Sequence, residues 1–171
     1  EDMRPDGGRV LLSRYVSAAE TRLFVLDLKT GAVTPIGETK KKVAYASPKF
    51  TADSQGVVVL SDDGKEVTLP VVIDIATGKA RHLSMVAVEA RSDKRPPLWG
   101  AEALVLSPDR RTAAVATNED GYTRIDLYAL DRTDGTTFKA AVPLPKGVGT
   151  GMGFSDDGGK LAISLSTSTG A

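Results

Sequence analysis

The 171-residue sequence has no cysteine, one histidine and one tryptophan, and its 22 basic residues are matched by 22 acidic residues. Without cysteine the chain cannot form disulfides or use thiolate chemistry. A net charge of zero removes the usual electrostatic basis for binding nucleic acid or an anionic membrane, so we expect no nucleic-acid partner. No apolar run approaches the roughly 20 residues that a membrane helix needs, and we expect no membrane span.

Sequence motifs for catalysis and cofactor binding are also missing. No G-x-S-x-G occurs, and the nearest sequence, GMGFSDD at 151–157, has its serine at another position. His82 is the only possible base of a Ser-His-Asp triad, and we interpret it as an ordinary residue of an outer strand. The acidic clusters lack the alternating oxygen ligands of a calcium loop and are typical of turns. We therefore predict no catalytic residue, no cofactor and no metal site on this chain.

One phrase recurs four times along the chain. It reads LSPDRRTAAVAT from Leu106, FSDDGGKLAISLS from Phe154, FTADSQGVVVLS from Phe50 and RPDGGRVLLS from Arg4. Its aspartates are separated by 47, 56 and 48 residues, and they are Asp6, Asp53, Asp109 and Asp157. About 20 residues after each of the first three turns comes a second phrase: VLDLKTG, VIDIATG and LYALDRTDG. Self-similarity at such a period indicates a repeat architecture.

Within each period, apolar runs rich in Val, Ile and Leu alternate with Asp-Gly, Thr-Gly or Pro-Asp turns. This pattern is typical of hairpins, and no sustained helical stripe occurs, so we expect almost no helix. The expected strands are 43–50, 57–61, 69–75 and 79–83 in the second period, and 103–107, 112–118, 124–130 and 137–142 in the third. Four antiparallel strands per period predict a β-propeller blade.

The fold class predicted is therefore all-β, a β-propeller fragment of about three and a half four-stranded antiparallel blades. We expect a partial blade 1 that lacks its inner strand, then complete blades 2 and 3 and a partial blade 4. The expected bounds are 1–38, 39–84, 101–145 and 146–171, with a linker at 85–100. A closed propeller needs at least about four whole blades, so we expect the native molecule to continue beyond both ends. The glycines of GVGTGMGFS, from Gly147, predict close backbone approach near the propeller axis.

The strand–SPDG–strand phrase followed by D-x-x-T-G resembles the repeat of TolB-like (PD40) propellers. It is most similar to the propeller that precedes the catalytic domain of prolyl-oligopeptidase (S9) serine peptidases, and the resemblance covers essentially the whole chain. It implies a non-catalytic propeller that gates and positions short peptide substrates. The partner would be the α/β-hydrolase domain of the same parent protein, a serine peptidase of the bacterial cytoplasm or periplasm.

Two other functions fit the same repeat. One is a TolB-like protein-interaction propeller without enzymatic activity, which would bind a protein through its loops or central channel. The other, a weaker alternative, is a propeller enzyme with acidic groups in its channel, as in some glycosidases. A G-x-S-x-G followed by Asp and His further along the parent chain would select the peptidase.

The linker between blades 2 and 3 is the most irregular part of the repeat. Its sequence SMVAVEARSDKRPPLWG lengthens one period by about nine residues. Strand alternation places it at the same propeller end as the turns at 17–20, 63–66 and 120–122. We predict that it contacts a partner or substrate through Arg91, Lys94, Arg95 and Trp99. The alternative is a surface loop in which Trp99 packs between blades.

Overall fold

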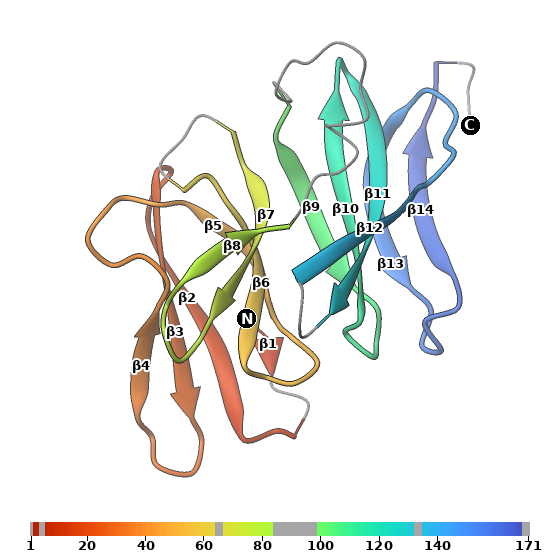
Figure 1. The fold of residues 1–171 in the computed structure, drawn as a ribbon. Helices are drawn as coiled ribbons and strands as arrows, with labels where there is room; N and C mark the ends of the chain where they lie inside the picture. Colours follow the sequence, from red (N-terminus) through yellow and green to blue (C-terminus); the bar gives the residue numbers. More distant parts are fainter. Residues whose placement is uncertain (1, 4–5, 64–66, 84–98, 132–134, 169–171) are drawn as a thin grey trace. The chain divides into compact units, whose positions relative to one another are not determined.

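A computed structural model describes residues 2–3, 6–63, 67–83, 99–131 and 135–168. Every regular element in these residues is a β-strand, and strands that are neighbours in a sheet run antiparallel (Figure 1). The all-β prediction is therefore confirmed. None of these residues belongs to a helix long and apolar enough to cross a membrane.

The strands form three four-stranded sheets and one two-stranded sheet, each in simple sequence order. The first sheet contains β1 (Asp2–Met3), β2 (Arg9–Ser17), β3 (Glu20–Asp27) and β4 (Val33–Ile36). The second contains β5 (Tyr45–Phe50), β6 (Gly56–Ser61), β7 (Leu69–Asp74) and β8 (Ala80–His82). The third contains β9 (Ala101–Leu106), β10 (Thr112–Glu119), β11 (Tyr122–Asp131) and β12 (Gly135–Ala141). The last contains β13 (Val148–Phe154) and β14 (Leu161–Ser166).

Three whole blades and half of a fourth confirm the predicted total, but the prediction that blade 1 lacks its inner strand was wrong. The inner strand is β1, in which Asp2 pairs with Leu11 and Met3 pairs with Val10. Two residues are too few to show a strand pattern in the sequence. The Asp2 carboxylate also accepts a hydrogen bond of 2.9 Å from the Phe50 amide, so it joins β1 to the next blade.

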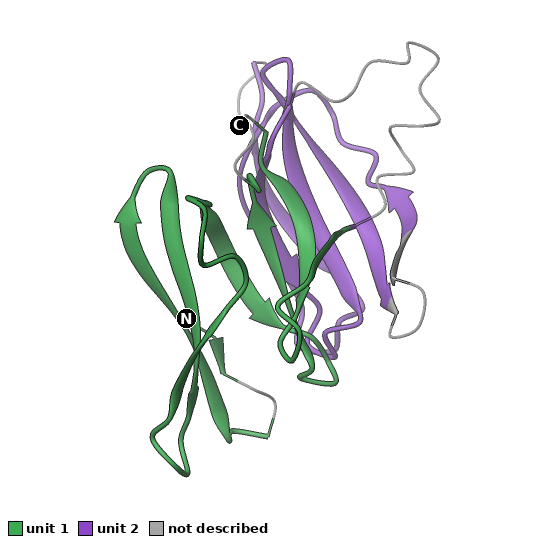
Figure 2. Cartoon of the chain, turned by 60° about the vertical axis from the view of Figure 1, so that its left-hand side comes forward, with its two compact units in different colours: residues 1–82 green, residues 83–171 purple. Residues whose placement is uncertain are grey.

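The chain divides into two compact units, residues 1–82 and 83–171 (Figure 2). Unit 1 contains β1 to β8, and unit 2 contains β9 to β14. Each unit therefore brings two successive blades together.

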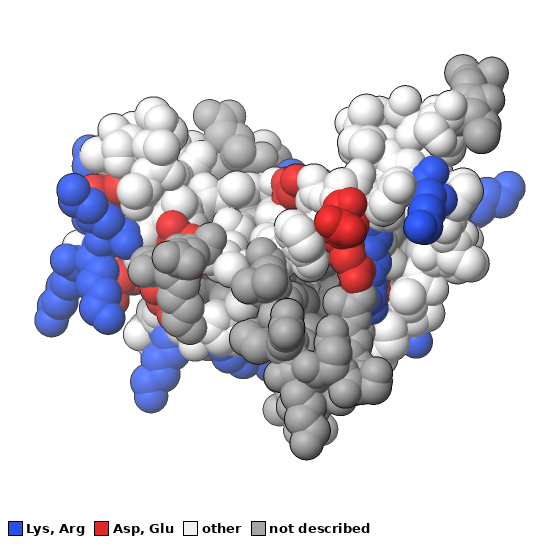
Figure 3. Space-filling model, turned by 90° about the horizontal axis from the view of Figure 1, so that it is seen from above, with Lys and Arg blue, Asp and Glu red and all other residues white. Residues whose placement is uncertain are grey.

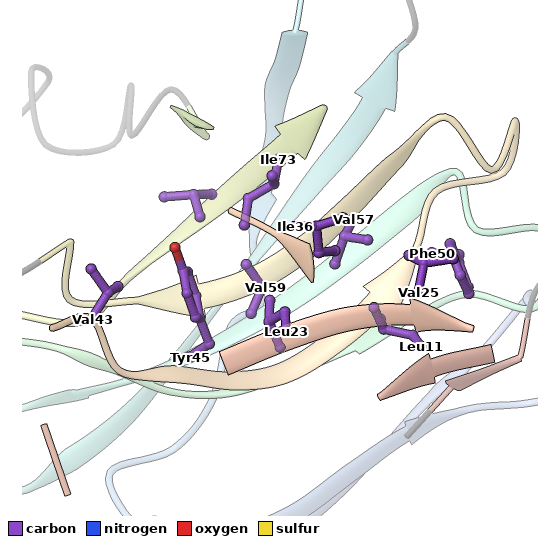
Figure 4. Packing of buried hydrophobic residues seen from close by; sticks show 11 residues of the cluster. Leu11, Leu23, Val25, Ile36, Val43, Tyr45, Phe50, Val57, Val59 and Ile73 are labelled. Carbon is purple, nitrogen blue, oxygen red and sulfur yellow. The ribbon is translucent and has the colours of Figure 1, made fainter. Parts of the chain in front are cut away.

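The core of unit 1 is mostly aliphatic and lies between its two sheets. All six residues of β6, the sequence GVVVLS, are buried, as expected for a middle strand covered on both faces. The buried cluster (Figure 4) consists of Leu11, Leu23, Val25, Ile36, Val43, Tyr45, Phe50, Val57, Val59, Val71 and Ile73. Burial of this apolar surface is the main source of stability for the pair of blades.

Unit 2 uses smaller side chains in its middle strand. Ala114, Ala116 and Ile125 form the buried cluster there, with partly buried aliphatic and aromatic residues packed around it. Next to it, the rings of Tyr128 and Phe138 meet edge to face with centroids 6.0 Å apart. Burial raises the pKa of the Tyr128 hydroxyl to about 12.

The recurring S/T-x-D turn is built by one hydrogen-bond pattern. In blade 3, the Ser107 hydroxyl donates to Asp109 Oδ1 at 2.6 Å and accepts from the Thr112 amide at 2.9 Å. The Asp109 carboxylate also accepts from the Arg111 amide at 3.0 Å. Thr51 and Ser155 make the corresponding bonds in blades 2 and 4. These bonds explain why a hydroxyl residue stands two positions before each of these aspartates.

The residue after each turn aspartate has a positive φ. The value is +71° at Gly7 and +70° at Gly158, where glycine adopts it without steric cost. It is +58° at Ser54 and +57° at Arg110, where a Cβ atom opposes this conformation. The fold therefore requires the same backbone at all four turns, even where the sequence lacks glycine.

Candidate functional site

The two ends of each unit differ in chemistry. We call the end with the S/T-x-D and D-x-x-T-G turns the turn end, and the end at which β2 joins β3 or β10 joins β11 the hairpin end. At the turn end, Asp27 Oδ1 accepts from the Thr30 amide and hydroxyl, and Asp74 Oδ1 accepts from the same two groups of Thr77. These bonds lower the pKa of both carboxyl groups. The polar groups of these turns thus serve mainly to build the turns.

The hairpin end of unit 1 carries exposed apolar side chains. Tyr15 is 74% exposed and Val16 is 48% exposed, next to the β2–β3 turn. The pairing of β2 with β3 shifts between Tyr15 and Ser17, which is a β-bulge at Val16. Bulges re-aim side chains near functional sites, so this hairpin is a candidate contact point.

The hairpin end of unit 2 has a similar character. Tyr122, 44% exposed, begins β11, and the Lys146 ammonium lies 5.1 Å from its ring centroid in a cation–π contact. Val148, 51% exposed, begins β13 beside it, because the Thr123 amide donates to the Gly147 carbonyl at 2.8 Å. These side chains form an aromatic and aliphatic surface with a basic group at its side.

Trp99 belongs to the same end of unit 2. It precedes β9, and Ala101 pairs with Thr117 near the end of β10, so Trp99 lies at the level of the β10–β11 hairpin. Trp99 is 37% exposed, so part of its indole ring is available to a partner. The predicted contact residues Arg91, Lys94 and Arg95 lie outside the described residues.

Two arginines at these ends, Arg22 and Arg124, are held by acidic neighbours. In unit 1, Arg22 Nη2 lies 2.6 Å from Glu20 Oε1, and Arg22 Nη1 donates to the Glu38 carbonyl. In unit 2, Arg124 Nε lies 3.0 Å from Asp126 Oδ1, and Arg124 Nη1 lies 3.7 Å from a Glu119 oxygen. Half-buried pairs of this kind hold strand ends in place and leave the aromatic groups as the distinctive part of the surface.

All three exposed aromatic side chains of the described residues, Tyr15, Trp99 and Tyr122, lie at hairpin ends. Exposed aliphatic groups such as Leu28 and Val33 occur at the turn end. Aromatic side chains are enriched among residues that anchor protein interfaces, so the hairpin end of each unit is a candidate partner surface. Sequence reasoning identified Trp99 but missed Tyr15 and Tyr122; their positions beside hairpin turns were the available signal.

The glycines of GVGTGMGFS have two different roles. A Cβ atom at Gly147 would lie 2.5 Å from the Ser166 carbonyl oxygen, and one at Gly149 would lie 3.0 Å from the Thr123 side chain. Close approach therefore explains these two glycines. At Gly151 and Gly153 no atom of the described residues lies within 4 Å of such a position, so the same explanation was wrong for them.

The sequence also raised His82 and the acidic clusters as candidates for catalysis or metal binding. His82 ends the outer strand β8 and is exposed, as expected for an edge-strand residue. Among the described residues, no group of three or more His, Asp or Glu side chains is arranged to hold a metal ion. The face in Figure 3 carries both basic and acidic side chains, some of them next to one another, among uncharged side chains.

No protein-family model and no curated protein sequence matches this chain. Solved structures do match. A structure from a study of two prolyl endopeptidases has a TM-score of 0.68 at 11% identity, covering 96% of this chain and 25% of that one. TolB from Acinetobacter baumannii has a TM-score of 0.56 at 16% identity, covering 99% and 43%. A chain of the mitotic checkpoint complex has a TM-score of 0.58 at 16% identity, covering 95% and 43%.

These likenesses establish the fold. The chain has the β-propeller fold found in TolB and in prolyl endopeptidases, and it spans less than half the length of each of these three structures. The mitotic checkpoint structure has the same architecture in a different cellular setting, so fold alone does not select a function.

Proposed function

We propose that this chain is a non-catalytic propeller segment of a prolyl-oligopeptidase-like serine peptidase, where it gates and positions short peptides for a hydrolase domain. The observation that carries the proposal is the structural likeness to a prolyl endopeptidase at a TM-score of 0.68 over 96% of the chain. The absence of G-x-S-x-G from the sequence agrees with a catalytic serine on another domain.

The hairpin end of unit 2 would contact the hydrolase domain or the peptide through Trp99, Tyr122 and Val148. The hairpin end of unit 1 offers Tyr15 as a separate contact. Such side chains supply large contact areas at low entropic cost, while the polar groups of the turn end bond mainly within their own turns. Arg91, Lys94 and Arg95 would add charge to the same contact.

The test uses the full-length parent protein. Trp99→Ala and Tyr122→Ala, made separately and together, should each weaken domain docking or peptide kcat/KM by about fivefold or more, the loss typical of an anchor residue. Removal of residues 91–97 should act in the same direction. Leu28→Ala is the matched control, because Leu28 is 51% exposed at the turn end. Unchanged kinetics and unchanged domain assembly in all hairpin-end variants would overturn the proposal.

The second candidate is a TolB-like interaction propeller without enzymatic activity, favoured by the likeness to TolB over 99% of the chain. The downstream sequence of the parent separates the two. A G-x-S-x-G followed by Asp and then His selects the peptidase, and a stop codon after a few more blades selects the interaction protein.

A further inference from the structure

A pocket of about 320 Å³ opens within unit 1, at the lower end of the size range of small-molecule sites. Its walls come from the segment between blades 1 and 2 and from all four strands or strand ends of blade 2. The lining residues include Glu38, Lys40, Tyr45, Ser61, Asp63 and Ala80. The pocket lies wholly inside one compact unit.

Two buried hydroxyl groups line this pocket, and each has a proton without an acceptor among the described residues. Tyr45 is 8% exposed and Ser61 is 3% exposed. Tyr45 Oη accepts from the Glu38 amide at 3.0 Å, and Ser61 Oγ accepts from the Asp63 amide at 3.0 Å. Neither hydroxyl donates a hydrogen bond in the described part of the chain. Both donors line the pocket, so an acceptor on a bound ligand can replace water as their partner.

The two donors are neighbours. Tyr45 on β5 pairs directly with Ser61 on β6, so their side chains occupy the same face of the sheet. The Tyr45 ring is fixed by the unit 1 core, where it stands alongside Leu23 and Val59 (Figure 4). Gly37 lies close over the hydroxyl, because a Cβ atom there would be 2.9 Å from Tyr45 Oη. The donor positions are thus set before any ligand binds.

The charged groups of the pocket restrict the ligand. The lining residues include two carboxylates, from Glu38 and Asp63, one ammonium group, from Lys40, and the imidazole of His82. The backbone amide of Lys40 holds the pKa of Glu38 below its usual range, so this carboxylate stays ionised at neutral pH. An anion would meet net repulsion here. An uncharged ligand must offer acceptors to the hydroxyls and a donor to the Glu38 carboxylate.

We propose that this pocket binds the backbone of a short, uncharged peptide segment with small side chains. A peptide group carries one carbonyl acceptor and one N–H donor, which match the hydroxyls of Tyr45 and Ser61 and the carboxylate of Glu38. Val71 and Ala80 supply apolar wall that suits a methyl-sized side chain. This site goes beyond the proposed gating function and does not depend on a hydrolase domain.

The test is a titration of the 171-residue chain with N-acetyl-L-alanine N-methylamide, followed by amide NMR. The Glu38 and Asp63 amides should report binding directly, since they donate to the two hydroxyl oxygens. A ligand of this size should bind with a Kd in the millimolar range. Acetate and glucose are the comparison probes, and neither should produce saturable shifts at these amides. Equal or tighter binding of either one, or no saturable shift with the diamide, would overturn the proposal.

Variants then assign the contacts. Tyr45→Phe and Ser61→Ala should each raise the Kd about three- to tenfold, the usual effect of one hydrogen bond. Tyr128→Phe, at a buried tyrosine of unit 2, and Ser13→Ala, at an exposed position of β2, are the matched controls. Ala80→Leu fills the pocket from the exposed outer strand without removing a hydrogen bond and should abolish binding while the amide spectrum stays folded. Wild-type affinity in Tyr45→Phe, Ser61→Ala and Ala80→Leu would contradict the proposed contacts.

Discussion

Replacing Ser54 by glycine should stabilise the protein, although it removes side-chain atoms from a buried position. Ser54 is 7% exposed, with a φ of +58° in the S/T-x-D turn of blade 2. The Ser54 hydroxyl makes no hydrogen bond to any of the described residues. Glycine already occupies the same position in blades 1 and 4, at φ values of +71° and +70°.

The expected change in stability is the sum of three contributions. An L-residue in the left-handed region costs about 1–2 kcal/mol, which glycine removes. Glycine loses about 0.5–1 kcal/mol through the greater freedom of the unfolded chain. Removal of a buried hydroxyl without a partner adds a smaller gain. We expect a net stabilisation of about 1 kcal/mol, or a rise in Tm of about 2–4 °C for cooperative unfolding of a chain of this size.

The assay is urea unfolding followed by circular dichroism, with Ser54→Ala as the matched control. Ser54→Ala removes the same hydroxyl but keeps the Cβ atom, so it should be less stable than Ser54→Gly by about 0.5–1 kcal/mol. The Thr51–Asp53 hydrogen bond of 2.6 Å is untouched in both variants. If Ser54→Gly unfolds at a lower urea midpoint than Ser54→Ala, backbone strain at this turn is not the controlling factor.

Three further perturbations have defined outcomes. Gly147→Ala should lose about 1–3 kcal/mol of stability by thermal unfolding, because its Cβ would lie 2.5 Å from a backbone oxygen, whereas Gly151→Ala should be neutral or slightly stabilising. The hydroxyl hydrogen bonds that lower the pKa of Asp109 and Asp157 stabilise the fold fully above the unfolded value of about 3.9, and this contribution should disappear as pH falls through the lower folded values. An acid titration of Tm should show that loss, and Asp157→Asn should reduce it; an unchanged acid limb would contradict the assignment. Phe50→Ala should cost about 3–5 kcal/mol in urea unfolding, since the ring is fully buried, and a loss below 1 kcal/mol would exclude it from the core.

The repeat, the strands and the fold class could be predicted because their signals are local. In blade 3, every turn bond from Ser107 and Asp109 joins residues no more than five apart in the sequence. The middle strand β6 is buried on both faces and reads as the continuous apolar run GVVVLS. The boundary errors were small, such as the start of β5 at Tyr45 in place of Val43.

Other features could not be predicted from the sequence because they depend on contacts between distant segments. The two-residue strand β1 exists through its pairing with β2, and its Asp2 carboxylate reaches an amide 48 positions away. Gly147 and Gly151 look alike in the sequence, but a Cβ atom would lie 2.5 Å from the Ser166 carbonyl oxygen at Gly147 and would meet no described atom within 4 Å at Gly151. Trp99 could be identified as a candidate contact residue because it is the single tryptophan. Tyr122 could be identified only from its exposure in the structure and from Lys146 beside its ring.

By itself, the order of residues determined that this chain forms four-stranded antiparallel blades, since turn chemistry and apolar runs act over a few neighbouring positions. Only the tertiary structure decided which hydroxyls would be buried together. Tyr45 and Ser61 are sixteen positions apart, and the sequence around either residue does not indicate that the two pair across neighbouring strands. Strand pairing places them side by side facing one cavity, because a sheet register fixes neighbours that no local pattern encodes.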